Sequence, residues 1–224
     1  MRSRLCIETI VVACAMATLS AIGGAATAMP SGEQYAFVPP ASPDVFGTVA
    51  LTAGMTAYDV RWRRVSEADQ SDARIVEIAA AAAGLDDMRK LAAVQTEVNR
   101  RITWRADLDG YGLADYWANA GETLTKGVGD SEDIAVVKIQ ALKAAGFNAR
   151  DLYLSVGRDN VRGADALLLV RVEGHFYVLD DRADRPLTPE QHARFVPVIT
   201  LGSGKAWLHG RSIANGAKPN RLAR

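Results

Sequence analysis

The stretch Gly129–Gly146, which reads GDSEDIAVVKIQALKAAG, is where the chain changes from helical to strand patterning. Asp130 is a typical N-cap, and the acidic residues after it suit the positive end of a helix. One largely apolar face recurs at helical spacing, at Ile134, Val137, Lys138, Ala141, Leu142 and Ala145. Gly146 is a typical helix stop. We therefore predict a helix that begins near Asp130 and ends at Gly146.

Short apolar segments follow this helix, some with a period of two, and they predict strands. The segments are Leu152–Val156, Ala166–Val172, Phe176–Leu179 and Phe195–Leu201. Glu173-Gly174 predicts a tight turn that joins two of these strands into a hairpin.

Two helices are predicted before the stretch. The first has Ser71 as its N-cap and stops at Gly84, and the second runs from about Asp86 to Arg101. Helices that precede strands indicate an α+β domain. We expect N-terminal helices packed on an antiparallel β-sheet.

Residues 103–129 show little periodicity but many aromatic residues and glycines. We interpret them as a structured loop, because large aromatic side chains are usually buried. Trp104, Tyr116 and Trp117, together with Trp207, are therefore more typical of a core than of ligand stacking.

The first residues indicate export. A basic start at Arg2 and Arg4 precedes an apolar stretch, and Ala26-Thr27-Ala28 has small residues where a signal peptidase cuts. We predict a signal peptide at residues 1–28 and a periplasmic location. An uncleaved inner-membrane anchor is the alternative.

The rest of the chain divides into three parts by composition. Residues 29–45 read as an extended lead-in, residues 46–210 as the domain, and residues 211–224 as a disordered basic tail. The net charge of zero over 224 residues gives no electrostatic reason to expect nucleic acid as a partner. No further segment is apolar enough to predict membrane insertion of the mature chain.

Ser131 lies in the first turn of the predicted helix. Free N–H groups and the helix dipole at this position activate a thiol, whereas a hydroxyl needs an adjacent base. From spacing alone, a plain N-terminal turn with Asp130 as cap is favoured over a nucleophile.

Several motifs follow one another over nearly the whole mature chain. They are Phe46-Gly47-Thr48, Trp62, Val98-Asn99, Asp115-Tyr116-Trp117, Glu122-Thr123-Leu124, Gly129-Asp130-Ser131-Glu132-Asp133, Val178-Leu179-Asp180 and Trp207-Leu208-His209-Gly210. In order and spacing they resemble the bacterial transglutaminase-like cysteine proteinases. The resemblance implies a papain-like core, in which a helix with the cysteine packs on a sheet with histidine and aspartate. It also implies periplasmic, calcium-dependent cleavage of biofilm adhesins, controlled by a cyclic-di-GMP-sensing membrane receptor.

The resemblance implies a degenerate triad. The cysteine position falls on Ser131, the histidine position on Asp165, and the aspartate position on Asp180. Both cysteines of the chain, Cys6 and Cys14, lie in the predicted signal peptide, so the mature chain would have no thiol. An Asp165–Asp180 pair that shares a proton and activates water is a less favoured alternative.

The three histidines are interpreted as non-catalytic. We expect His175 to be exposed beside the hairpin turn, His192 to lie in a polar loop, and His209 to be structural.

The resemblance further implies calcium at the acidic residues around the nucleophile position, which are Asp130, Glu132 and Asp133. Calcium prefers six to eight oxygen ligands, including carboxylates. Asp107-Leu108-Asp109-Gly110 could add ligands, but it does not match an EF-hand loop, and we interpret it as a simple turn.

These observations favour an exported, catalytically inactive peptidase homologue that binds a protein of the cell envelope, with calcium as a cofactor. Its expected partner is an adhesin N-terminal region or an inner-membrane receptor. One alternative is an active hydrolase that uses Ser131, and another is a structural domain with neither role.

Overall fold

The computed structural model describes residues 39–67 and 71–211. The predicted signal peptide, most of the lead-in and nearly all of the basic tail lie outside the described residues. A six-stranded sheet has the order β1-β8-β7-β4-β5-β6, and all its neighbouring strands are antiparallel. The strands are β1 (Val49–Ala53), β4 (Leu152–Asp159), β5 (Gly163–Val172), β6 (His175–Leu179), β7 (Phe195–Gly202) and β8 (Lys205–Gly210).

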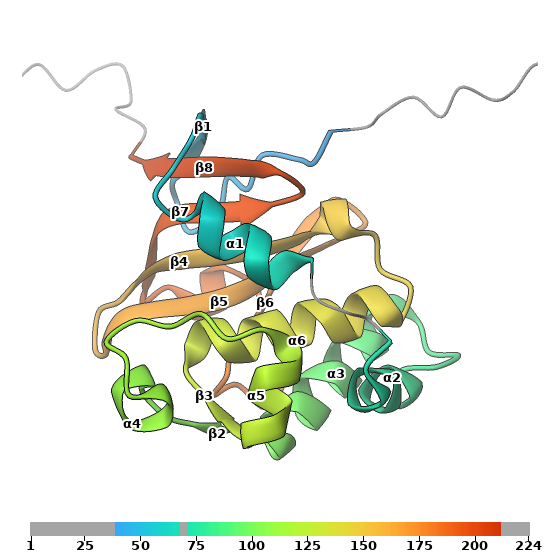
Figure 1. Cartoon of the computed structure of the whole chain (residues 1–224). Helices are drawn as coiled ribbons and strands as arrows, with labels where there is room; N and C mark the ends of the chain where they lie inside the picture. Colours follow the sequence, from blue (N-terminus) through green and yellow to red (C-terminus); the bar gives the residue numbers. More distant parts are fainter. Residues whose placement is uncertain (1–38, 68–70, 212–224) are drawn as a thin grey trace, which may run out of the picture. The chain divides into compact units, whose positions relative to one another are not determined.

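Helices cover one face of this sheet (Figure 1). They are α1 (Asp59–Ser66), α2 (Ala73–Ala80), α3 (Asp87–Arg101), α4 (Asp107–Tyr111), α5 (Ala120–Lys126) and α6 (Ser131–Ala144). Two short 3₁₀ helices, η1 (Ala149–Asp151) and η2 (Glu190–His192), lie in the connections before β4 and β7. The two-residue strands β2 (Thr103–Trp104) and β3 (Val128–Gly129) pair in parallel. The predicted α+β fold is therefore confirmed.

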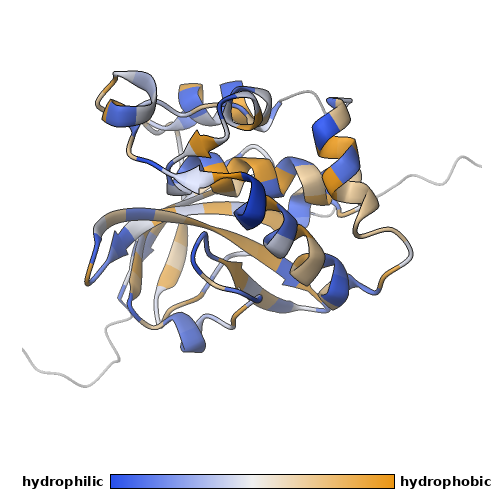
Figure 2. Cartoon of the chain, turned by 90° about the horizontal axis from the view of Figure 1, so that it is seen from below, coloured by the Kyte–Doolittle hydropathy of each residue, from blue (hydrophilic) through white to orange (hydrophobic). Residues whose placement is uncertain are grey.

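Helix α6 lies at the centre of the core. It packs against β4 and β5 on one side and against α2, α3 and α5 on the other. Because it is covered from both sides, consecutive residues such as Val136 and Val137 are both buried. Figure 2 shows the resulting run of hydrophobic residues along this helix and the central strands.

The opposite face of the sheet carries a smaller core. It contains Tyr153, Leu167, Leu169, Phe195 and Trp207, covered by Val45 from the segment before β1. Alternate residues of β5 point to opposite faces, so Leu168 and Val170 join the helix side instead. Burial on both faces explains why this strand reads as an uninterrupted apolar run.

The predicted strands and hairpin are confirmed. The four predicted strands lie within β4, β5, β6 and β7. Glu173 and Gly174 have φ angles of 50° and 87°, which is the backbone of a type I′ hairpin turn. Among the described residues, no helix has the length and apolar character needed to span a bilayer.

Other local predictions were wrong. The N-cap of α2 is Asp72, which accepts the Arg74 N–H, and not Ser71. Residues 103–129 are not a loop but contain β2, α4, α5 and β3. Trp104 is not a core residue, since it is 51% exposed. These elements are short, and tertiary packing rather than periodicity stabilises them.

Candidate functional site

The N-terminus of α6 positions Ser131. Asp130 caps the helix by accepting the Asp133 N–H, and Ser131 follows as the first helical residue, buried to 6% exposure. Gly129 is required just before the cap, because a Cβ there would lie 2.8 Å from the Asp133 Cβ. The pairing of β2 with β3 brings Trp104 beside Gly129, and the Trp104 indole N–H donates to Ser131 Oγ at 3.3 Å.

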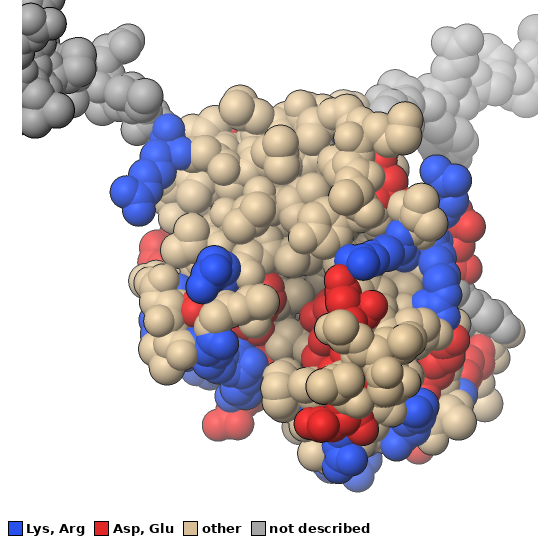
Figure 3. All heavy atoms as spheres, turned by 60° about the vertical axis from the view of Figure 1, so that its left-hand side comes forward, with Lys and Arg blue, Asp and Glu red and all other residues tan. Residues whose placement is uncertain are grey.

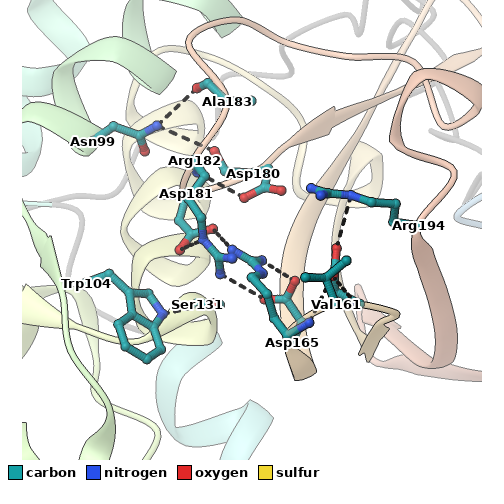
Figure 4. A network of polar contacts seen from close by, with 12 residues as sticks. Asn99, Trp104, Ser131, Val161, Asp165, Asp180, Asp181, Arg182, Ala183 and Arg194 are labelled. Atoms are coloured by element: carbon teal, nitrogen blue, oxygen red, sulfur yellow. Dashed lines mark hydrogen bonds and ion pairs between the residues drawn. The ribbon is translucent and has the colours of Figure 1, made fainter.

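Asp165, at the histidine position, lies near the start of β5 and is buried. Its carboxylate forms an ion pair with Arg162, and its Oδ1 lies 3.6 Å from Nη2 of Arg182 (Figure 4). Burial raises the pKa of Asp165, while hydrogen bonding to Ser131 and the charge of Arg162 oppose that rise. The structure therefore brings Ser131 and Asp165 together, but it also places two guanidinium groups on Asp165.

Asp180, at the aspartate position, follows the end of β6. Its Oδ1 accepts the Arg182 backbone N–H at 2.9 Å, and its Oδ2 lies 3.2 Å from Nε2 of His192. The prediction of a polar loop for His192 was wrong, because this side chain is only 5% exposed. An imidazole thus faces Asp180 from η2, rather than from the position that Asp165 occupies on β5.

Asp181 is the acidic neighbour that interacts with Asp180 by a side-chain hydrogen bond. Burial raises the pKa of Asp181, and that hydrogen bond raises it further. Arg162 lies 3.8 Å from Asp181, so the same arginine faces both Asp165 and Asp181. The proton-sharing pair suggested for Asp165 and Asp180 stays a prediction.

The other two histidines are distant from this group or held elsewhere. His175 is exposed and pairs with Val172, at the far end of β5 from Asp165. His209 is held between the hydroxyls of Thr48 and Thr200, at 2.7 and 2.8 Å. Burial lowers the pKa of His209 to about 4, as expected for a structural histidine.

A group of three carboxylates lies beside Ser131. One oxygen each from Asp107, Asp130 and Glu132 lies within 4.8 Å of the others. Burial raises the pKa of Asp130, and the neighbouring acids raise it further. Asp107 Oδ2 accepts the Tyr116 N–H at 2.5 Å, whereas its buried Oδ1 has no hydrogen-bond partner among the described residues.

Asp107 was not among the predicted ligands, because its segment was interpreted as a turn. It opens α4 instead, and the fold brings this helix next to the start of α6. Asp133 does not join the group, and its Oδ1 accepts the Ala118 N–H at 2.7 Å. Its role as a calcium ligand stays a prediction.

The carboxylates and Ser131 share one cleft of about 420 Å³. The cleft also has aromatic walls, formed by Tyr58, Trp104 and Trp117. On the side turned forward in Figure 3, acidic side chains border a hollow below a broad face without charged residues. Such a cleft can hold an extended apolar segment against an acidic wall, and oxygen ligands of this kind suit a hard divalent cation.

Sequence reasoning also missed Arg162 and Arg182 as neighbours of the triad positions. The sequence contained a signal for both arginines, because Arg162 lies three residues before Asp165, and Arg182 directly follows Asp180-Asp181. Arg162 reaches Asp165 from three residues away, whereas the antiparallel pairing of β5 with β6 brings Arg182 to the same carboxylate.

Comparisons with known proteins agree with this geometry. The sequence profile of the family described as "Bacterial transglutaminase-like cysteine proteinase BTLCP" matches residues 53–200. Calcium-bound LapG of Legionella pneumophila is similar in structure, with 20% sequence identity, a TM-score of 0.53, and coverage of 70% of this chain and 93% of that chain. EGTA-treated LapG of Legionella pneumophila gives the same identity and TM-score, with coverage of 73% and 95%. No curated protein sequence matches the chain.

Proposed function

Since the chain belongs to the bacterial transglutaminase-like cysteine proteinase family, we propose that it is a member that binds its target in the cleft without cutting it. The thiol of the family is absent from residues 15–224, and Ser131 stands in its place. A serine hydroxyl needs a base to accept its proton. The proposal therefore depends on what stands beside Ser131.

The ion pairs of Asp165 are the observation that carries the proposal. Arg162 forms an ion pair with this carboxylate and the Arg182 guanidinium lies 3.6 Å from its Oδ1, so two positive charges compensate the negative charge that a base would use. Histidine serves as base in such triads because its pKa lies near neutral pH. Here the buried imidazole of His192 faces Asp180, whereas the hydroxyl of Ser131 interacts with Trp104 and Asp165 instead.

The acidic group supports binding of calcium. Asp107, Asp130 and Glu132 offer converging oxygen atoms, one of them buried and unpaired, and no lysine or arginine forms an ion pair with them in the part of the chain that the structure describes. These residues fit a calcium ion, which would supply the missing positive charge and fix the orientation of the cleft's acidic wall. LapG of Legionella pneumophila has a calcium-bound structure, which makes calcium the first cation to test.

The target that we propose is an extended segment of an envelope protein, such as an adhesin N-terminal region or the periplasmic part of an inner-membrane receptor. The aromatic walls of the cleft suit apolar side chains of such a segment. The location that we propose is the periplasm, on the sequence of residues 1–28.

A hydrolase that uses Ser131 is the second candidate. The observation in its favour is the interaction of Ser131 with Asp165, whose pKa is raised by burial. A carboxylate with a raised pKa is a better base than an ordinary aspartate. The two candidates differ in one measurable respect, which is turnover.

The test incubates purified protein with adhesin N-terminal fragments, in calcium and in EGTA. We expect the fragment to co-purify intact in calcium, and Glu132→Gln to weaken co-purification while the control Glu190→Gln, on η2, does not. Calcium-dependent cleavage that Ser131→Ala abolishes, and that the surface control Ser66→Ala retains, would overturn the non-catalytic proposal.

A further inference from the structure

A second hollow, of about 680 Å³, adjoins the cleft. The segment 112–117 lies between the two: Leu113 and Tyr116 line the second hollow, whereas Trp117 lines the cleft. We call the second hollow the α5 groove, because residues of α5 line it. The residues used below are Arg74, Tyr111, Leu113, Tyr116, Glu122 and Lys126. Its volume lies within the range of ligand-binding sites.

The α5 groove has an aromatic surface. The rings of Tyr111 and Tyr116 lie 4.9 Å apart, and Leu113 beside them is 50% exposed. Lys126 Nζ lies 4.6 Å from the centre of the Tyr111 ring, in a cation–π arrangement. The groove therefore offers an apolar contact next to a positive charge.

The charges around the α5 groove are unevenly compensated. Glu122 forms an ion pair with Arg64 at 2.7 Å, and Asp72 forms one with Arg74 at 2.6 Å. Lys126 donates to the Gly110 carbonyl at 2.8 Å but forms no ion pair with a carboxylate among the described residues. The acids of the groove are thus neutralised, while one cation keeps its charge.

We propose that the α5 groove docks an acidic peptide segment of a partner protein. An apolar side chain of the segment lies on Tyr111 and Leu113, and a neighbouring carboxylate pairs with Lys126. Charge-assisted contact beside an aromatic surface gives both orientation and affinity. Docking does not require a functional cleft, because the groove contains none of Ser131, Asp165 and Asp180 and none of the three clustered carboxylates.

The experiment uses the full mature protein and an array of 12-residue peptides. Each peptide places acidic residues around a single leucine, phenylalanine or tyrosine, in every register, and has a counterpart with lysine in place of each acid. Peptides that bind are then measured by fluorescence anisotropy against wild type, Lys126→Glu, Leu113→Ser, and the control Arg89→Glu. Arg89 lies exposed on α3.

We expect binding of acidic but not basic peptides, weakened at least tenfold by Lys126→Glu and about fivefold by Leu113→Ser, and unchanged by Arg89→Glu. Circular dichroism verifies that the variants are folded. If Lys126→Glu does not fold, Leu113→Ser supplies the test, because Leu113 is exposed. The proposal would be overturned if no acidic peptide bound, or if Lys126→Glu and Leu113→Ser both bound the peptides as tightly as wild type does. Cleavage of a target in the cleft would overturn the proposed function but not the docking proposal, so the two proposals fail separately.

Discussion

Two groups of carboxylates, which we call the compensated half and the acidic half of the site, differ in how their negative charge is balanced. Around the triad positions, Asp165 and Asp181 face Arg162 and Arg182, and Asp180 faces His192. At the start of α6, the group of Asp107, Asp130 and Glu132 has no ion pair among the described residues. In the compensated half, arginine side chains and His192 balance the negative charge of the carboxylates, whereas the acidic half has no positive side chain paired with it in residues 39–67 and 71–211. The negative charges at the triad positions are thus balanced within the protein, whereas the acidic group offers oxygen ligands to a cation.

The largest expected effect is stabilisation by calcium. Saturating calcium, at about 100 times its dissociation constant, adds about 3 kcal/mol to the free energy of unfolding. Differential scanning calorimetry in calcium and in EGTA measures the change as a rise in the melting temperature. Glu132→Gln removes most of this rise, and Glu190→Gln leaves it unchanged. An equal melting temperature in both buffers would show that the acidic half needs no cation.

The next effect concerns the compensated half. Asp165→Asn removes the carboxylate between two guanidinium groups and lowers the free energy of unfolding by about 2 kcal/mol, since a partly buried charge loses its partner. Urea denaturation measures the loss. Asp115→Asn is the matched control, because the exposed Arg61–Asp115 pair should contribute less than about 1 kcal/mol. Equal losses in the two variants would remove the distinction between the halves.

A pH effect comes from Lys138, which is fully buried beneath the compensated half. Its Nζ donates to the Asp180 carbonyl at 3.0 Å, and burial lowers its pKa to about 7, against the opposing charges of Asp181 and Asp180. A lysine with a lowered folded pKa contributes stability above its unfolded pKa of 10.5, and that contribution is lost as pH falls toward 7.

Between pH 7 and 9, wild type should therefore gain about 2 kcal/mol of stability relative to Lys138→Met. Parallel denaturation curves at both pH values test this difference. Lys90→Met, on the outer side of α3, serves as the control and should follow wild type. Identical pH slopes for wild type and Lys138→Met would mean that the buried lysine keeps its charge throughout.

The smallest effect is expected at Ser131. Its hydroxyl accepts a 3.3 Å hydrogen bond from the half-exposed Trp104 and also interacts with Asp165, which keeps its ion pair with Arg162 when the hydroxyl is removed. Ser131→Ala should change the free energy of unfolding by less than about 1 kcal/mol. A larger loss in a urea titration would assign the hydroxyl a role in stabilising the cleft.

Much of the scaffold was predictable from local patterns. Helical spacing predicted α6 and α3 nearly to their ends, and apolar runs predicted β4, β5, β6 and β7. The edge strand β1 and its partner β8 were missed, because each depends on pairing between residues at opposite ends of the described chain. Short elements such as α4 lack the length for a clear periodic signal.

The candidate site was predictable only in part. The sequence indicated that Ser131 begins a helix, that Asp130 caps it, and that no thiol follows Cys14. It gave no reason to expect Asp107 beside Glu132, or His192 beside Asp180. These contacts join different elements, and no spacing rule relates residues so far apart in sequence.

Local sequence predicted most of the long elements and supplied the residue types at the positions of the family triad, because capping and periodicity act between residues within one or two turns. The tertiary structure alone decided which charges meet. Sheet pairing brought Arg182 to Asp165, beside the nearby Arg162, and the position of α4 at the start of α6 brought a third carboxylate to an acidic pair. Whether a buried charge is compensated is a property of packing in three dimensions, and on that property the proposed change from cutting to binding depends.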